Sequence, residues 1–172
     1  MEIAFRINSS KAEVFTLVQD YLESLEFNIL SKDDNRPWGG FFVFDEEDAE
    51  KFTNAFFQGY NVKDLKKEYK LSPKILLVEP GKRLSWQYHQ RRAEIWRILQ
   101  GQVGISISDT DFEPEGKLYK PGDIIQLGNR QRHRLKGLSE WGIVAEIWQH
   151  TDQNHPSDEE DIVRLKDDFG RG

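Results

Sequence analysis

The chain has 172 residues, 37% of them hydrophobic and 12% aromatic, which is enough for one domain with a sizeable core and excludes an intrinsically disordered chain. Its 24 basic and 30 acidic residues give a net charge of −6, which argues against a dedicated nucleic-acid binder because such domains are normally basic. The lack of cysteine excludes disulfides, zinc fingers and thiol catalysis.

The sequence carries no signal for export or membrane insertion. No apolar run approaches the ~18 residues that span a bilayer. The first residues lack the charged-then-apolar order of a signal peptide. We therefore expect a cytoplasmic protein whose partners include neither a membrane nor a nucleic acid.

The N-terminal part begins with a short apolar run at residues 3–7, which is read as a strand. Residues 9–27 then repeat apolar side chains at helical spacing and predict a helix with one apolar face. Ser10 is followed three positions later by Glu13, which is the pattern of a capping box at the start of a helix.

Residues 31–59 are predicted to form a loop, a strand and a second helix. Residues 31–40 are polar and contain Pro and Gly, which predicts a loop. Residues 41–44, "FFVF", read as a buried strand. Residues 45–59 predict a second helix, which Asp45 can cap and Gly59 can end.

From residue 72 onward, short strand-like runs alternate with turns. These runs are residues 74–81, 83–89, 94–101, 102–108, 117–122, 123–128, 131–135 and 141–150. Regularly spaced short strands are typical of an antiparallel sandwich or barrel. We predict a mainly β protein in which residues 1–71 form a helical and strand extension packed on a barrel of residues 72–172, as one structural unit, with a polar C-terminal tail.

The alternation of side chains along a predicted strand indicates a buried polar site. The predicted strand at 83–89 places Arg83, Ser85, Gln87 and His89 on one face and Leu84, Trp86 and Tyr88 on the other. Polar groups inside a barrel are costly unless they are satisfied, and one divalent metal ion satisfies several at once. His and Glu are ordinary ligands of such ions, and a Gln carbonyl oxygen can complete the set. The predicted ligands are Gln87, His89, Glu94 and His133; separate surface histidines are the alternative.

Other conspicuous residues have more than one interpretation. Four cations share the face opposite to His133: Arg130, Arg132, Arg134 and Lys136. A solvated basic face is expected for most of them, whereas a phosphate cradle needs a bend near Arg130. Trp38 and Trp96 suit core packing or a sugar platform, and His150 and His155 are expected in a solvated loop. The apolar face of Trp86 needs cover, either from the N-terminal helices or from a second copy in a homodimer.

The spacing of these residues resembles the two motifs of the cupin family. The first motif runs Gly, five residues, His-x-His, three or four residues, Glu, six residues, Gly. This chain keeps that spacing, with Gln for the first His, through Gly81, Gln87, His89, Glu94 and Gly101. The second motif runs Gly, five residues, Pro-x-Gly, two residues, His. Its spacing is kept, without the Pro and the second Gly, through Gly122, Gly128, Arg130 and His133.

Four segments, in order, also resemble the small single-cupin (type II) phosphomannose isomerases. They are "RPWGGF" at 36–41, "PGKRLSWQYHQRRAEIW" at 80–96, "HRL" at 133–135 and "EEDIVRLKDDFGR" at 159–171. The resemblance covers most of residues 36–171 and leaves residues 1–35 out. The chain departs from the family at four positions, where His or Tyr is usual: Gln90, Arg91, Ile95 and Phe169. Arg91 lies near the predicted site and could alter substrate choice.

The resemblance implies a jelly-roll barrel and a metal-dependent sugar-phosphate isomerase, with mannose 6-phosphate and fructose 6-phosphate as the leading pair. Zinc is the family's usual ion, but the ligand set does not separate zinc from manganese, iron, cobalt or nickel. The candidate catalytic residues are Arg92, Glu146 and Asp161. The candidate substrate-binding residues are Ser85, Arg164 and Arg171, since arginine offers a fork of donors to phosphate oxygens. Two alternatives stay open: a non-catalytic cupin that binds a sugar or sugar phosphate, and an iron-dependent cupin oxygenase.

Overall fold

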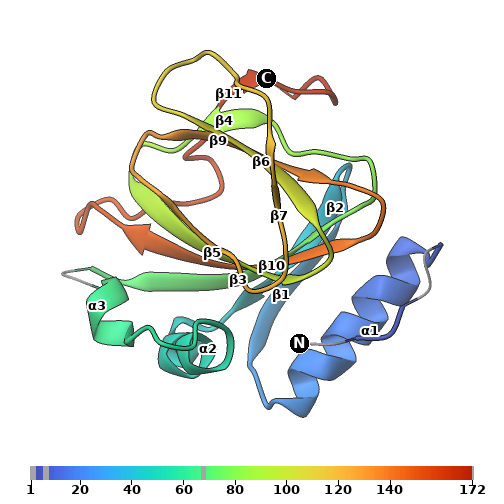
Figure 1. Cartoon of the computed structure of the whole chain (residues 1–172). Helices are drawn as coiled ribbons and strands as arrows, with labels where there is room; N and C mark the ends of the chain where they lie inside the picture. The colour runs from blue at the N-terminus through green and yellow to red at the C-terminus, as the bar shows by residue number, and fades with distance from the viewer. Residues whose placement is uncertain (1–2, 6–7, 67–68, 172) are drawn as a thin grey trace.

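A computed structural model describes residues 3–5, 8–66 and 69–171 of the chain. Its centre is a pair of antiparallel sheets that face each other as a barrel (Figure 1). The six-stranded sheet has the order β1 (Ile29–Arg36), β2 (Gly39–Phe44), β3 (Leu71–Val78), β10 (Gly142–His150), β5 (Arg92–Gln100) and β8 (Ile124–Leu127). The five-stranded sheet has the order β11 (Val163–Lys166), β4 (Trp86–Tyr88), β9 (Arg132–Gly137), β6 (Val103–Ser108) and β7 (Lys117–Tyr119). The predicted mainly β, antiparallel barrel is confirmed, and each strand-like run from residue 74 to 150 overlaps one of the strands β3 to β10.

The helices lie together on the outer face of the six-stranded sheet (Figure 1). They are α1 (Lys11–Ser24), the 3-10 turn η1 (Glu46–Asp48), α2 (Ala49–Phe56) and α3 (Val62–Lys66). One buried apolar cluster joins Val14 and Leu22 of α1 and Phe52 of α2 to the outward side chains Ile75 and Ile147 of the sheet. Within the part of the chain that the structure describes, none of the helices is long and apolar enough to cross a membrane.

The two faces of the central strands serve different cores. In β3, Ile75 and Leu77 pack under the helices, while Leu76 and Val78 belong to a second cluster inside the barrel. That second cluster also includes Val103 of β6, from the opposite sheet. Because both faces are buried, polar residues on the inward face of these strands stand out as candidates for a site.

The side chains of two capping residues predicted from the sequence, Ser10 and Asp45, cap helical turns. The Ser10 side chain accepts a hydrogen bond of 3.2 Å from the Glu13 backbone N–H, as the capping pattern predicted. The Asp45 side chain accepts from the Glu47 N–H and caps η1. The predicted second helix is therefore divided into η1 and α2, and Gly59 follows it with φ of 91°.

The loop prediction for residues 31–40 is wrong, because β1 runs to Arg36. Its polar side chains fit an edge strand that faces water on one side and pairs with β2, for example Lys32 with Phe42. The turn into β2 requires glycine at Gly39, which has φ of 143° and where a Cβ would lie 1.9 Å from the Leu77 carbonyl oxygen. Polarity alone does not separate an edge strand from a loop.

Three further points concern segments outside the predicted barrel strands. Residues 3–5 are not in a strand, and residues 6–7 of the predicted first strand lie outside the described residues. The short helix α3 and the strand β11 had not been predicted. The strands on the two sides of the predicted division at residue 71 belong to one sheet, since β2 pairs with β3.

Candidate metal centre and its cavity

The four predicted metal ligands meet inside the barrel. Gln87 of β4 is the cross-strand partner of His133 in β9, and Glu94 enters from β5 in the other sheet. The four side chains are 2% to 8% exposed. His89, Glu94 and His133 each offer a ligand atom within 4.8 Å of the others. This buried group could bind a metal ion.

Main-chain carbonyls fix both imidazole rings. His89 Nδ1 donates to the Asp161 carbonyl oxygen at 2.7 Å, and His133 Nδ1 donates to the Gln131 carbonyl oxygen at 3.0 Å. These bonds select the tautomer that turns the Nε2 lone pair of each ring inward. Among the described residues, His133 Nε2 is buried with no hydrogen-bond partner and lies 3.8 Å from Glu94 Oε2. A buried, unsatisfied lone pair beside a carboxylate fits a bound cation.

The charge states of these groups also suit a metal. Burial raises the pKa of Glu94, but the electrostatic effects of the neighbouring His89 and Arg92 outweigh it and hold this pKa well below its usual value. Burial lowers the pKa of His133 to about 4, against the raising effect of Glu94. At neutral pH the pair therefore offers an ionised carboxylate and a neutral imidazole, which are the forms that bind metals.

Gln87 is held by Ser85, whose hydroxyl donates to Gln87 Oε1. Gln87 Nε2 lies 3.4 Å from His89 Nε2. A half-turn of the amide would point Oε1 at the same place, and the Ser85 hydroxyl would then accept from Nε2 instead of donating. Ser85 is fully buried and does not line the cavity described below, so its contact is with the amide of Gln87.

Arg92 is buried against the same carboxylate. Its Nε donates to Glu94 Oε1 at 2.8 Å, and its guanidinium stacks 3.5 Å above the Trp148 ring centroid. One of its amino groups lies 3.2 Å from His89 Nε2. Arg92 therefore places a positive charge against both Glu94 and His89.

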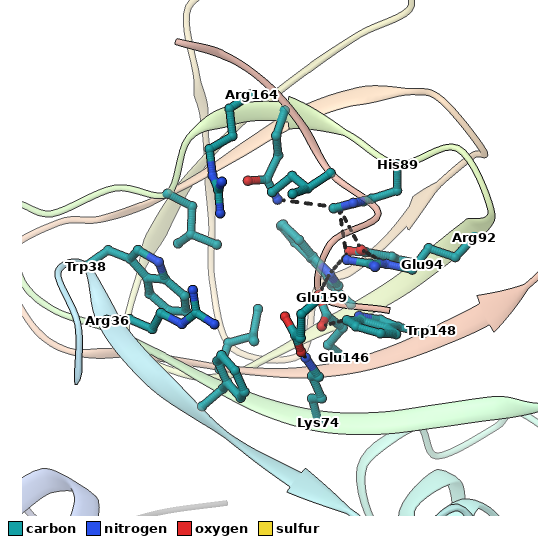
Figure 2. Close-up of a pocket in the computed structure, with 16 residues that line it drawn as sticks. Arg36, Trp38, Lys74, His89, Arg92, Glu94, Glu146, Trp148, Glu159 and Arg164 are labelled. Carbon is teal, nitrogen blue, oxygen red and sulfur yellow. Dashed lines mark hydrogen bonds and ion pairs between the residues drawn. The ribbon is translucent and has the colours of Figure 1, made fainter. Parts of the chain in front are cut away.

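The polar group opens into a cavity (Figure 2), where the space not filled by protein atoms, open solvent included, is about 570 Å³. Figure 2 shows His89, Arg92 and Glu94 on one side and Arg36 with Trp38 on the other, with Arg164 and Lys74 at opposite edges between them. Trp38 and Trp96 are buried and both line this cavity, so they serve packing and cavity wall together.

Glu146 stands on the cavity wall beside the ligands. Its two carboxyl oxygens accept from the indole N–H of Trp96 and of Trp148, each at 2.8 Å. Burial, followed by the nearby charge of Glu94, raises the pKa of Glu146 to about 8. Glu146 and Arg92 are the candidate catalytic residues that line the cavity.

The structure places Asp161 and Arg171 away from the cavity wall. The Asp161 carboxylate accepts from the backbone N–H of Gln90 and of Arg91, each at 3.0 Å, so it ties the C-terminal segment to the turn after His89. Arg171 forms two bonds of 2.8 Å with Asp167. Arg164 does line the cavity.

Sequence reasoning missed several residues of the cavity, among them Arg36, Lys74, Trp148 and Glu159. Lys74 could have been found from parity, since it is the charged residue on the same face of β3 as the inward Leu76 and Val78. Glu159 could not, because the path of the C-terminal segment follows no sequence period.

Several side-chain expectations need correction. Leu84 lines the cavity with Gln87 instead of sharing the face of Trp86, because the chain is irregular before β4 begins. Trp86 is fully buried in the single chain, where its Nε1 donates to the Asp111 carbonyl oxygen at 2.9 Å. The reason for expecting a second copy over that face therefore disappears. His150 is 5% exposed at the end of β10 instead of solvated.

The basic face on β9 is only partly solvated. Arg134 is 4% exposed and forms two hydrogen bonds to the Glu113 carboxylate, at 2.6 and 2.9 Å. Arg130, where the cupin motif has Gly, has φ of 64° and is exposed. The bend that a phosphate cradle needed is present, but Arg130 and Arg134 do not converge on one cavity among those the described residues form.

Comparison with known families agrees with this geometry. Residues 45–167 match the family described as "Mannose-6-phosphate isomerase C-terminal". The chain belongs to this family. A search of curated proteins found no match. All four predicted ligands of this cupin lie within the matched range.

Solved structures show the same fold at low identity. The oxalate decarboxylase of Lactobacillus farciminis, in complex with formate, has a TM-score of 0.52 and 14% identity over 79% of this chain and 33% of that one. A mutant of Bacillus subtilis oxalate decarboxylase OxdC has a TM-score of 0.51 and 18% identity, over 82% of this chain and 30% of that one. Recombinant oxalate oxidase in complex with glycolate has a TM-score of 0.51 and 15% identity, over 77% of this chain and 58% of that one. The chain thus spans between 30% and 58% of the length of these cupins, whose likeness shows the fold alone.

Proposed function

We propose that this cupin is a metal-dependent isomerase that interconverts an aldose phosphate and a ketose phosphate, with mannose 6-phosphate and fructose 6-phosphate as the leading pair. The observation that carries the proposal is the buried group of His89, Glu94 and His133, whose ligand atoms lie within 4.8 Å of one another, with His89 and Glu94 on the cavity wall. Membership of the Mannose-6-phosphate isomerase C-terminal family supports the choice of reaction.

Gln87, His89, Glu94 and His133 would hold the ion, and zinc is the leading candidate. A bound divalent ion supplies a positive charge that stabilises negative charge developing on the sugar oxygens. Arg92 keeps Glu94 ionised and in place through its 2.8 Å bond. The Asp161 carbonyl oxygen keeps His89 in the ligand tautomer, so we assign Asp161 a positioning role.

The reaction moves a proton between neighbouring carbons. The C2–H bond of the aldose breaks, its electron pair forms the C1–C2 double bond, and the carbonyl oxygen on C1 takes up a proton. Proton return to C1, with loss of the proton on the C2 hydroxyl, gives the ketose. Glu146 is our candidate for the group that carries the proton, because its carboxyl lies on the cavity wall between Trp96 and Trp148.

The test is a coupled assay of the zinc-loaded protein with hexose and heptose phosphates in anaerobic buffer, with bound metal measured on the same sample. The proposal predicts turnover of a sugar phosphate that chelation removes and added metal restores. Oxygen consumption with bound iron would instead indicate an oxygenase. Saturable sugar-phosphate binding with no turnover would indicate a binding protein.

A further inference from the structure

The tripeptide Glu-Ile-Trp occurs twice on the wall of the cavity, once in β5 and once in β10. The two strands pair antiparallel, so that Trp96 lies opposite Glu146 and Trp148 lies opposite Glu94. Both central isoleucines belong to the core under the helices, and both glutamates and both tryptophans therefore face the barrel. Two carboxyls and two indoles thus alternate around one patch of the inward face.

The indole N–H groups hold the two carboxyls. Trp148 Nε1 donates to Glu146 Oε1 at 2.8 Å (Figure 2). Trp96 Nε1 shares its hydrogen between Glu146 Oε2, at 2.8 Å, and Glu94 Oε2, at 2.9 Å. The four side chains are 1% to 5% exposed, so the bonds are largely shielded from competing water.

The planes of both indole rings are fixed by their neighbours. The guanidinium of Arg92 lies 3.5 Å and the ammonium of Lys74 4.0 Å from the Trp148 ring centroid. The ring of Trp96 meets that of His133 edge to face, at 89° and with 5.4 Å between the centroids. Such contacts favour one orientation of an aromatic ring, so each N–H stays directed at its carboxyl.

The two glutamates share this frame but differ in their other neighbours. Glu94 accepts a 2.8 Å bond from Arg92 Nε and lies 3.1 Å from His89 Nε2, which commits it to the candidate metal centre. Within the described part of the chain, Glu146 forms no ion pair, and the two indoles are the donors that reach its oxygens. They hold it in place on the cavity wall, as a group must be held that stays within reach of a reacting atom.

We propose that Trp96 and Trp148 are positioning residues that fix the Glu146 carboxyl beside the candidate metal centre, and that the shared N–H of Trp96 also supports the ligand Glu94. The proposal deepens the proposed function and rests on it, because Glu146 is there the group that carries the proton. The N–H of Trp148 reaches Glu146 alone, whereas that of Trp96 reaches both carboxyls. Losing one or the other should therefore have different effects.

The experiment removes each N–H and keeps an aromatic ring. Trp148→Phe and Trp96→Phe are compared with the control Trp141→Phe, a buried change outside the cavity that also loses an indole bond, at 3.2 Å to the Ser9 carbonyl oxygen. Chelator competition gives zinc affinity, urea unfolding shows that each variant is folded, and the coupled assay at saturating zinc gives kcat and KM for mannose 6-phosphate.

A second measurement needs no tryptophan substitution. The chain has five tryptophans, and their indole N–H signals are recorded by nitrogen-15 NMR for the zinc-loaded wild type and for Glu146→Gln. The signals of Trp96 and Trp148 should move in this variant, because an amide replaces the carboxyl that accepts both bonds. The signal of Trp141 should stay in place.

Trp148→Phe should lower kcat about ten- to a hundredfold, since a shift of about 1 Å in a reacting group costs that much. KM and zinc affinity should not change, which is the mark of a contribution made in the transition state. Trp96→Phe should lower kcat by a similar factor and also weaken zinc binding about ten- to a hundredfold, the usual effect of losing a partner of a metal ligand. Trp141→Phe should alter none of these quantities.

Three results would overturn the proposal: a kcat of Trp148→Phe equal to that of the control, a zinc affinity of Trp96→Phe equal to that of wild type, or indole signals of Trp96 and Trp148 that stay in place in Glu146→Gln. A wild type that turns over no sugar phosphate would contradict the isomerase alone. The zinc affinities and the indole signals would then still decide whether the two tryptophans hold Glu94 and Glu146.

Discussion

Replacing Asp161 with alanine should loosen the C-terminal segment and the candidate metal centre together. Its carboxylate accepts from the backbone N–H of Gln90 and of Arg91, each at 3.0 Å, and from the Ser157 hydroxyl at 2.6 Å. Burial raises the pKa of Asp161, yet these bonds outweigh it and the pKa lies below its usual value. At neutral pH the group is therefore an ionised acceptor of three bonds.

The size of the effect follows from these three bonds. At about 1 kcal/mol for each lost hydrogen bond, Asp161→Ala should lower the free energy of unfolding by about 3 kcal/mol. The main-chain oxygen of Asp161 also orients His89, and alanine keeps this oxygen, so metal affinity falls only because the loosened segment no longer holds the oxygen in place. Loss of such support typically reduces metal affinity by about ten- to a hundredfold, which is the upper limit of the expected effect.

Urea unfolding and zinc titration measure these two losses. Glu160→Ala, an exposed change in the same segment, is the matched control and should alter neither. The reasoning would be refuted if Asp161→Ala lost less than about 0.5 kcal/mol, the range of ordinary surface changes, and bound zinc as tightly as wild type.

Three other predictions test different parts of the structure. Glu94→Gln should abolish both zinc binding and turnover, while the exposed control Glu140→Gln should keep both. Metal analysis and the coupled assay measure the two properties, and retained metal with full activity in Glu94→Gln would count against the site. Burial, followed by the charge of Lys70, lowers the pKa of His150 to about 4, whereas the pKa in the unfolded chain is near 6.5. The stabilising effect of the neutral His150 is therefore complete above pH 6.5 and is lost as the pH falls toward 4. Relative to His150→Gln, wild type should therefore lose up to about 2 kcal/mol between pH 7 and 5 in urea unfolding, and parallel pH profiles would disprove this. Lys11→Met should lower stability by about 1.5 to 3 kcal/mol, because Lys11 donates to three main-chain carbonyls of the β1–β2 hairpin; an unchanged urea midpoint would contradict it.

Strand alternation and motif spacing were enough to predict which polar side chains meet inside the barrel, because successive residues of a regular strand face opposite sides. Gln87, His89 and Glu94 follow from one motif, and His133 from a second strand that pairs directly with Gln87. The same argument failed at Leu84, where the backbone is irregular and alternation does not hold. The loop prediction for residues 31–40 rested on polar, Pro and Gly content and failed for β1, whose polar side chains are those of an edge strand.

Part of the cavity lining was beyond sequence reasoning for a different reason. Arg36, Lys74 and Glu159 come from segments that are distant in the chain, and only the sheet order and the path of the C-terminal segment bring them together. Burial of His150 likewise depends on contacts with Ser72 and Ser157, which no local pattern reveals.

The most direct test of the account is X-ray absorption spectroscopy of the zinc-loaded protein. Convergence of His89, Glu94, His133 and Gln87 on one ion predicts one zinc per chain, with scattering from two imidazoles at about 2.0 to 2.1 Å and the remaining ligands oxygen. A zinc shell without imidazole scattering, or the same spectrum in His89→Ala and His133→Ala, would contradict it.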